Sequence, residues 1–174
     1  MPKLISPTSR LRDSWLESRE EWGRGIHQDG AGLRAGDDVD TAAGFAAWVS
    51  RLHREADHSV QLGDGRVHAT YWWITENDTY LGAITLRHAL SEILLRGAGH
   101  IGYGIRPSAR RRGLATWALG AVLPEARALG LDRVLVACDV GNVASARTIE
   151  KCGGLLEDVR DTELGRTRRY WITL

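Results

Sequence analysis

The sequence predicts a mixed α/β fold, in which a central sheet carries helices on its faces. Two observations lead to this prediction. Strand-like runs rich in Val, Ile, Tyr, Trp and Thr fill the middle of the chain, and strand-like and helical segments alternate after residue 100. This order of elements is typical of a sheet covered by helices.

Two helices are expected in the N-terminal part, separated by a segment rich in Gly and Asp. That segment, residues 23–40, predicts a mobile loop. Each helix has an apolar stripe and a candidate N-cap. The first is marked by Leu11, Trp15 and Trp22 after Thr8 or Ser9, and the second by Phe45, Trp48, Val49 and Leu52 after Thr41.

The remaining elements follow from strand propensity, turn residues and helix signals. Pro124 lies inside a predicted helix and costs about 3 kcal/mol there unless the helix bends or restarts. Asn142 is a fitting cap for the next helix. The predicted strands are residues 66–75, 80–87, 99–105, 133–139, 155–159 and 168–173, and the predicted helices are residues 89–97, 113–129 and 142–151.

Composition restricts the class of protein. The 174 residues suit one domain, 1–174, and a net charge of +1 gives no general attraction to nucleic acid or membranes. Cys138 and Cys152 form no CxxC pair, so neither a disulfide framework nor a metal site is expected. Without a long apolar run or a leader pattern, we expect a reduced, cytoplasmic chain with no membrane partner.

The most informative segment lies between residues 106 and 116. Four arginines and no acidic residue occupy positions 106–112, after a strand-like run and directly before a helix. The first N–H groups of a helix have no internal partner, and the helix dipole adds partial positive charge there. Gly113 and Ala115 are small enough for a phosphate to approach the backbone. The segment therefore predicts a site for a pyrophosphate.

Two motifs in this part of the chain resemble the GNAT acetyltransferase superfamily. Arg110, Gly113 and Ala115 occupy the places of its acyl-CoA loop, after a strand that ends in Ile-Arg-Pro. Asn142 then opens a helix that ends in Glu-Lys-Cys-Gly, similar to the later segment of the family. Together the motifs cover residues 100–154.

The resemblance implies the GNAT-like fold, in which two central parallel strands splay apart and acetyl-CoA lies between them. It also implies a division of the domain into an acceptor-side half (1–98), an acetyl-CoA-binding part (99–154) and C-terminal strands (155–174). The acceptor pocket is then expected among the N-terminal helices, the 23–40 loop and residues 76–98.

The same resemblance implies how acetyl-CoA is held. The backbone near Ile105 pairs with the pantetheine arm, the following amides bind the pyrophosphate, and a strand amide steadies the thioester oxyanion. The residues expected to bind acetyl-CoA are Ile105, Arg106, Arg110, Arg111, Arg112, Gly113, Leu114, Ala115, Thr116, Asn142 and Ser145.

Proton transfer requires a second set of residues in the expected site. Only a free amine attacks a thioester, so a group must accept its proton. His100 stands where several family members carry a carboxylate, although a half-buried histidine bonded to the backbone is the plainer interpretation. Glu92 is a weaker candidate. Ile149 replaces the tyrosine that protonates the leaving thiolate in many members, and Ser145 is the candidate substitute unless it only bonds locally.

The leading hypothesis is transfer of an acetyl group from acetyl-CoA to a primary amine of a small molecule or peptide, by direct attack in a ternary complex. The alternative is a non-catalytic acyl-CoA sensor, which Ile149 favours. A nucleic-acid-binding module is a third hypothesis, disfavoured because helix 113–129 is largely apolar. Acylation of Cys138 is less favoured than a packing role. The sequence leaves open whether the chain forms a homodimer.

Overall fold

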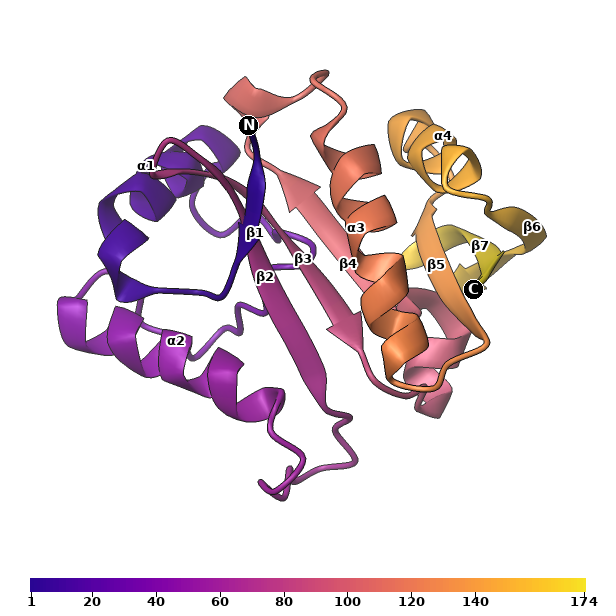
Figure 1. Ribbon diagram of the computed structural model, residues 1–174, viewed down its shortest axis with the longest axis horizontal. Helices are drawn as coiled ribbons and strands as arrows, with labels where there is room; N and C mark the ends of the chain where they lie inside the picture. The colour runs from indigo at the N-terminus through magenta and orange to yellow at the C-terminus, as the bar shows by residue number, and fades with distance from the viewer.

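A computed structural model describes residues 1–174 and contains one seven-stranded sheet with the order β1-β2-β3-β4-β5-β7-β6 (Figure 1). All neighbouring strands are antiparallel except β4 and β5. The strands are β1 (Lys3–Ile5), β2 (Ala69–Glu76), β3 (Thr79–Arg87), β4 (Ile101–Ile105), β5 (Arg133–Asp139), β6 (Leu155–Thr162) and β7 (Gly165–Thr173).

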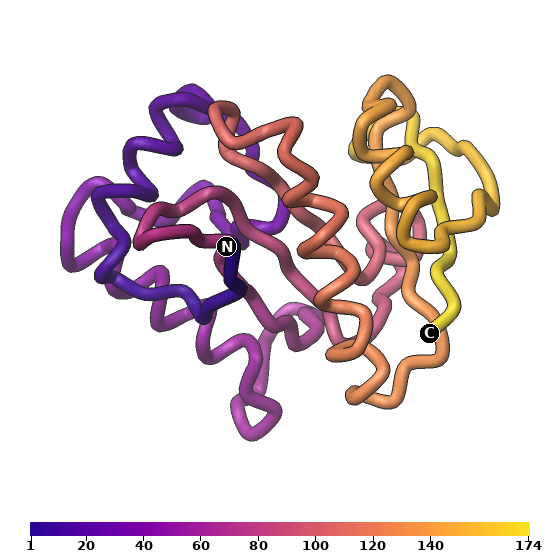
Figure 2. The backbone as a smooth tube through the Cα atoms, turned by 45° about the horizontal axis from the view of Figure 1, so that its top comes forward, coloured from indigo at the N-terminus to yellow at the C-terminus, as the bar shows by residue number.

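Two helices cover each face of the sheet. They are α1 (Arg12–Trp22) and α2 (Ala42–Glu55) on one face, and α3 (Leu114–Ala128) and α4 (Val143–Lys151) on the other. Trp73 and Ile74, which are adjacent on β2, are both fully buried but belong to the cores on opposite faces, as strand alternation requires. Figure 2 shows α4, β6 and β7 gathered at one end of the molecule, beside α3.

Most predicted elements are present, and their ends follow the local signals. Thr41 and Asn142 cap α2 and α4 through their side-chain oxygens, and β5 has the predicted bounds. Helix α3 continues through Pro124. Strand β1, whose three residues pair with β2, was not predicted from the sequence. None of the helices is long and apolar enough to span a membrane.

The predicted mobile loop is instead packed against the sheet over part of its length, a segment we call the covering segment (residues 28–32). Gln28 and Ala31 are only 4% and 1% exposed. Thr85 Oγ1 donates a 2.6 Å hydrogen bond to the carbonyl of Gly30. A Cβ at Gly30 would lie 2.7 Å from the carbonyl oxygen of Gly102 on β4, so this close approach requires glycine. The covering segment therefore packs over β3 and β4 in the middle of the sheet.

Candidate active site

The first turn of α3 presents a row of unbonded backbone N–H groups. The amides of residues 111–116, which we call the amide row, donate to no acceptor in the protein, and the first bond of the helix joins Trp117 N to Gly113 O at 3.0 Å. Arg111 and Gly113 have left-handed φ values of 64° and 76°. Turns of this type direct successive N–H groups toward one point and form anion-binding concavities. A Cβ on Gly113 would meet nothing within 4 Å, so the space beside this residue is open.

The side chain of Arg106, one of the residues expected to bind acetyl-CoA, is held by α1. Its Nε donates to Glu21 at 2.7 Å, and Ser108 N donates to the same carboxylate at 2.9 Å. Burial opposes the ionisation of Glu21, but the bonds from Ser108 and the Arg106 charge outweigh it and lower the pKa of this carboxyl. The contacts anchor the start of the basic segment to α1.

The other three arginines divide into two that are engaged and one that is free. Arg110 Nε donates to the Ile105 carbonyl at 3.1 Å, and its guanidinium lies 4.6 Å from the ring centroid of Trp22. Arg112 forms an ion pair of 2.6 Å with Glu76. Arg111 is exposed and has no such partner. The segment is therefore held by Arg110 and Arg112, and Arg111 remains unpaired.

Beside this row, the parallel strands β4 and β5 separate soon after they meet. Their only paired residues in the ladder are Ile101 and Val136, and Figure 1 shows the strands running apart beyond that point. Arg106 N donates to Leu81 O on β3 at 2.7 Å. Because bonding alternates along an antiparallel strand, the amides of Tyr103 and Ile105 face away from β3 and toward the opening between β4 and β5.

Tyr103 and Ser145 meet across this opening. Their hydroxyl groups are 2.7 Å apart, and the Ser145 amide donates to Asn142 Oδ1 at 3.1 Å. Burial is the main cause of a raised pKa at two groups here, the Tyr103 hydroxyl and the Cys138 thiol. Ile149 is fully buried in the core. Tyr103 was not among the residues expected from the sequence, although its separation of two positions from Ile105 on one strand would have placed the two amides on one edge.

The structure does not place His100 to accept a proton. The side chain is 4% exposed, and Nδ1 accepts a hydrogen bond of 2.9 Å from Leu135 N, which occupies the lone pair of the neutral ring. Burial, followed by the charge of Arg87, lowers its pKa to about 4. His100 thus joins β4 to β5 where the strands are still adjacent. Glu92 is exposed and lies in the short helical stretch directly before the π-helical segment η2 (Leu94–Ala98).

A second histidine, His27, immediately precedes the covering segment, which lies against β4. His27 Nε2 and Asp29 Oδ1 are 2.9 Å apart, and both side chains are largely exposed. A Cβ on Gly104 would lie 2.8 Å from the Asp29 carbonyl oxygen. Chain folding therefore brings a His–Asp pair beside the strand whose amides face the opening, a proximity that no local sequence signal indicates.

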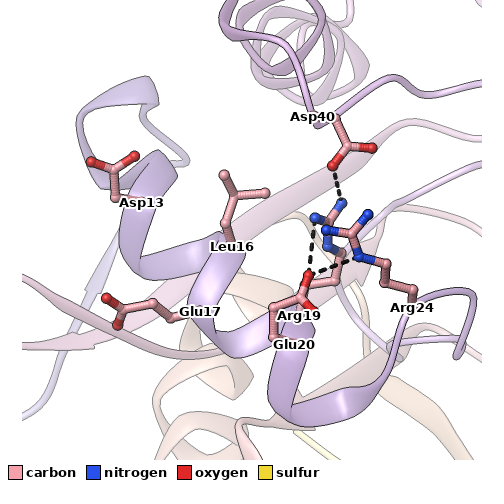
Figure 3. Close-up of a pocket in the computed structure, with 7 residues that line it drawn as sticks. All are labelled: Asp13, Leu16, Glu17, Arg19, Glu20, Arg24 and Asp40. Atoms are coloured by element: carbon pink, nitrogen blue, oxygen red, sulfur yellow. Dashed lines mark hydrogen bonds and ion pairs between the residues drawn. The ribbon is translucent and has the colours of Figure 1, made fainter.

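A surface groove of about 460 Å³ runs along α1 (Figure 3). Four of its charged side chains are paired with one another: Arg19 with Asp40 at 2.8 Å, and Arg24 with Glu20 at 2.9 Å. Leu16 is its one apolar lining residue. Both arginines of the groove are thus already neutralised by its own carboxylates, and the candidate site remains the amide row and the opening beside it.

The mixed sheet, its diverging parallel strands and the amide row define a class of acyl-transferring α/β enzymes. Residues 26–154 match the family model of the acetyltransferase (GNAT) domain. This match covers most of the chain, so the chain belongs to the GNAT acetyltransferase family and is an acyltransferase. No curated protein sequence shows significant similarity to it.

Solved structures with the same fold include several acetyltransferases. The microcin C7 self-immunity acetyltransferase MccE, in complex with acetyl-CoA and AMP, has a TM-score of 0.72 at 15% identity, over 99% of this chain and 92% of that one. RimL, a ribosomal L7/L12 α-N-protein acetyltransferase in complex with coenzyme A, has a TM-score of 0.73 at 16% identity, over 99% and 94%. Mycobacterium smegmatis RimJ has a TM-score of 0.74 at 20% identity, over 99% and 81%. At these identities the likeness establishes the fold.

The low pKa of His100 predicts a pH dependence of stability. An unfolded histidine titrates near 6.5, so between about pH 6.5 and 4 the unfolded chain binds a proton that the folded chain excludes. Stability therefore falls as the pH drops through this window. His100→Asn keeps an acceptor for Leu135 N but cannot titrate, and should flatten this decline in urea unfolding midpoints measured at several pH values. Parallel declines in the two proteins would contradict the assignment.

Proposed function

We propose that this chain is an N-acetyltransferase that takes the acetyl group from acetyl-CoA and transfers it to a primary amine. The observation that carries the proposal is the amide row at the start of α3. Hydrogen bonds to a charged group contribute roughly 1.5–3 kcal/mol each, so several amides directed at one diphosphate can anchor a large ligand. Arg111, which has no partner in the protein, adds positive charge beside them.

The identity of the donor is supported by the relatives with this fold. The MccE structure contains acetyl-CoA, and the RimL structure contains coenzyme A. In this chain we assign the diphosphate to the amides of Arg111, Arg112, Gly113, Leu114, Ala115 and Thr116. The pantetheine arm then follows the edge of β4 at Ile105, with Asn142 and Ser145 beyond it on α4.

The thioester is proposed to lie in the opening between β4 and β5. There the Tyr103 amide, which faces away from β3, can donate to the carbonyl oxygen and stabilise the negative charge that develops on it. The amine nitrogen forms the new bond to the carbonyl carbon, and the carbon–sulfur bond breaks with its electrons on sulfur. Burial raises the pKa of the Cys138 thiol and so disfavours the thiolate that an acyl-cysteine intermediate would require.

Ser145 is the proposed source of the proton for the leaving thiolate. Its hydroxyl reaches into the opening, and the hydrogen bond with Tyr103 fixes its orientation. Ile149 contributes only packing. Coenzyme A thiolate leaves tolerably without an acid, so the contribution of Ser145 is expected to fall below the usual range for general acids, which begins at about a hundredfold.

The proton lost by the amine is assigned to the His27–Asp29 pair in place of His100. When Asp29 holds the Nε2–H of His27, the other ring nitrogen keeps a free lone pair. The pair is solvated, so its proton can pass to water. The expected role of His100 as a base is not retained, because its lone pair is already bonded to Leu135 N.

The competing hypothesis, an acyl-CoA sensor, is separated from an enzyme by release of free thiol. The wild-type protein should release coenzyme A from acetyl-CoA in an amine-dependent manner, measured with a thiol-reactive dye over a panel of small amines and peptides. Binding of acetyl-CoA by calorimetry without thiol release from any amine would favour the sensor instead.

Gly113→Val should prevent binding of acetyl-CoA while leaving the fold intact. The substitution forces a β-branched residue into a left-handed φ of 76° and places its side chain in the open space before the amide row. Loss of two amide bonds to the diphosphate weakens affinity about a hundredfold or more. Gly130→Val is the matched control, since Gly130 has a similar φ of 87° and open space at the far end of α3. Equal acetyl-CoA affinity of the two variants by calorimetry would refute the assignment.

Ser145→Ala should lower kcat about tenfold without changing the KM for acetyl-CoA, because the hydroxyl is needed only when the thiolate departs. Tyr103→Phe removes the partner hydroxyl but leaves the Tyr103 amide, and should have a smaller effect on kcat. The kcat and KM of both variants are measured from steady-state thiol release. An unchanged kcat in Ser145→Ala would exclude the serine as the acid.

A further inference from the structure

Arg87, at the end of β3, is a half-buried arginine that no carboxylate in the protein neutralises. Its Nη1 donates to the carbonyl oxygens of Gly99 at 3.1 Å and Ala98 at 3.4 Å. These are its only hydrogen bonds, and it takes part in none of the ion pairs of the protein. Buried charges in proteins are normally paired because their desolvation is costly. An unpaired one in a transferase therefore requires an explanation.

One edge of the Arg87 guanidinium remains free. Nε and Nη2 donate to no acceptor, and neither is among the enclosed, unbonded nitrogen atoms of the protein, so solvent reaches both. The Nε and Nη2 hydrogens point in parallel, a geometry that matches the two oxygens of a carboxylate. The carbonyl groups of Ala98 and Gly99 meanwhile hold the opposite nitrogen in place. The free edge is thus a fixed, bidentate donor.

The nearest acidic network cannot supply the missing carboxylate. Glu55 is buried but already bonded by Tyr71 Oη at 2.6 Å, by Arg51 at 2.9 Å and by Arg34. Asp29, whose charge acts on Arg87, is largely exposed and paired with His27. Neither acidic residue is therefore available to neutralise Arg87. Glu55 is bonded to other side chains, and Asp29 belongs to the pair to which the proton of the amine is assigned.

The guanidinium also lies close to the proposed reaction centre. Nη1 and Nη2 are each 3.9 Å from the position that a Cβ would take on Gly102, beside the covering segment. Covalent geometry puts the next amide, that of Tyr103, about 3 Å from this position, so the guanidinium lies within about 7 Å of the proposed oxyanion donor. An amine and a carboxylate on one small molecule can span this separation.

We infer that Arg87 binds the carboxylate of the acceptor, so that the substrate is a small amino acid whose amine is acetylated. The inference rests on the proposed acetyl transfer and adds the class of acceptor. Arg87 holds the carboxylate through Nε and Nη2, and the ammonium group lies toward Asp29. Amines that carry no carboxylate leave the guanidinium unpaired and are therefore poor acceptors.

The first test compares the common L-amino acids with their carboxamides, in thiol release from acetyl-CoA by the wild-type protein. The best amino acid should exceed its own carboxamide by about tenfold or more in kcat/KM, since only the acid forms the bidentate pair. Equal or higher kcat/KM for the carboxamide would overturn the inference. If no amine releases thiol and acetyl-CoA does not bind, the proposed function itself fails.

The second test uses variants of Arg87. Arg87→Met should abolish the preference for the acid over the carboxamide while leaving the KM for acetyl-CoA unchanged, and Arg87→Lys should retain part of it. Arg96→Met is the matched control, because Arg96 is exposed and paired with Glu163 at 3.3 Å. A preference that persists in Arg87→Met would contradict the inference.

Binding provides a readout that does not depend on turnover. In the presence of coenzyme A, the preferred amino acid should raise the melting temperature of the wild-type and Arg96→Met proteins but not that of Arg87→Met. Should Arg87→Met fail to fold, the comparison is made with Arg87→Lys. If no amino acid binds the wild-type protein while acetyl-CoA does, the inference is wrong and the acetyl transfer stands.

Discussion

The unsatisfied N–H groups at the start of α3 are the constraint on which the site depends. A helix cannot bond its first amides internally, and here left-handed φ values at Arg111 and Gly113 extend the unbonded row into the preceding turn. The surrounding contacts prevent that turn from collapsing onto the helix. Arg106 fastens it to α1, Arg110 to the end of β4, and Arg112 to Glu76 on β2.

The divergence of β4 and β5 makes this row useful for chemistry. Two parallel strands that stay paired would bond their own amides, whereas here the Tyr103 and Ile105 amides face an opening. Ser145 on α4 reaches the same opening from the far side and is held there by Tyr103. One ligand can therefore be bound at its diphosphate by α3, along its arm by β4, and at its sulfur end by α4.

The sequence predicted the parts of the site that depend on local chemistry. The basic turn with Gly113 and the Asn142 cap are defined by neighbouring residues, and both have the expected structure. The roles of Arg106 and His100 could not be predicted in this way, because Glu21 and Leu135, their partners, are distant in sequence. Nor could the sequence predict that Arg87 lacks a carboxylate partner, because this depends on every residue that packs around it. The burial of the covering segment likewise depends on its contact with β4.

Hydrogen–deuterium exchange of the amide row tests the account most directly. Its N–H groups lack protein acceptors, so they should exchange fast in the free protein and become protected when coenzyme A binds. Pantetheine, which has the thiol arm but no diphosphate, should leave their exchange unchanged. Protection of residues 111–116 by coenzyme A alone is the predicted result, and unaltered exchange there at saturating coenzyme A would contradict it.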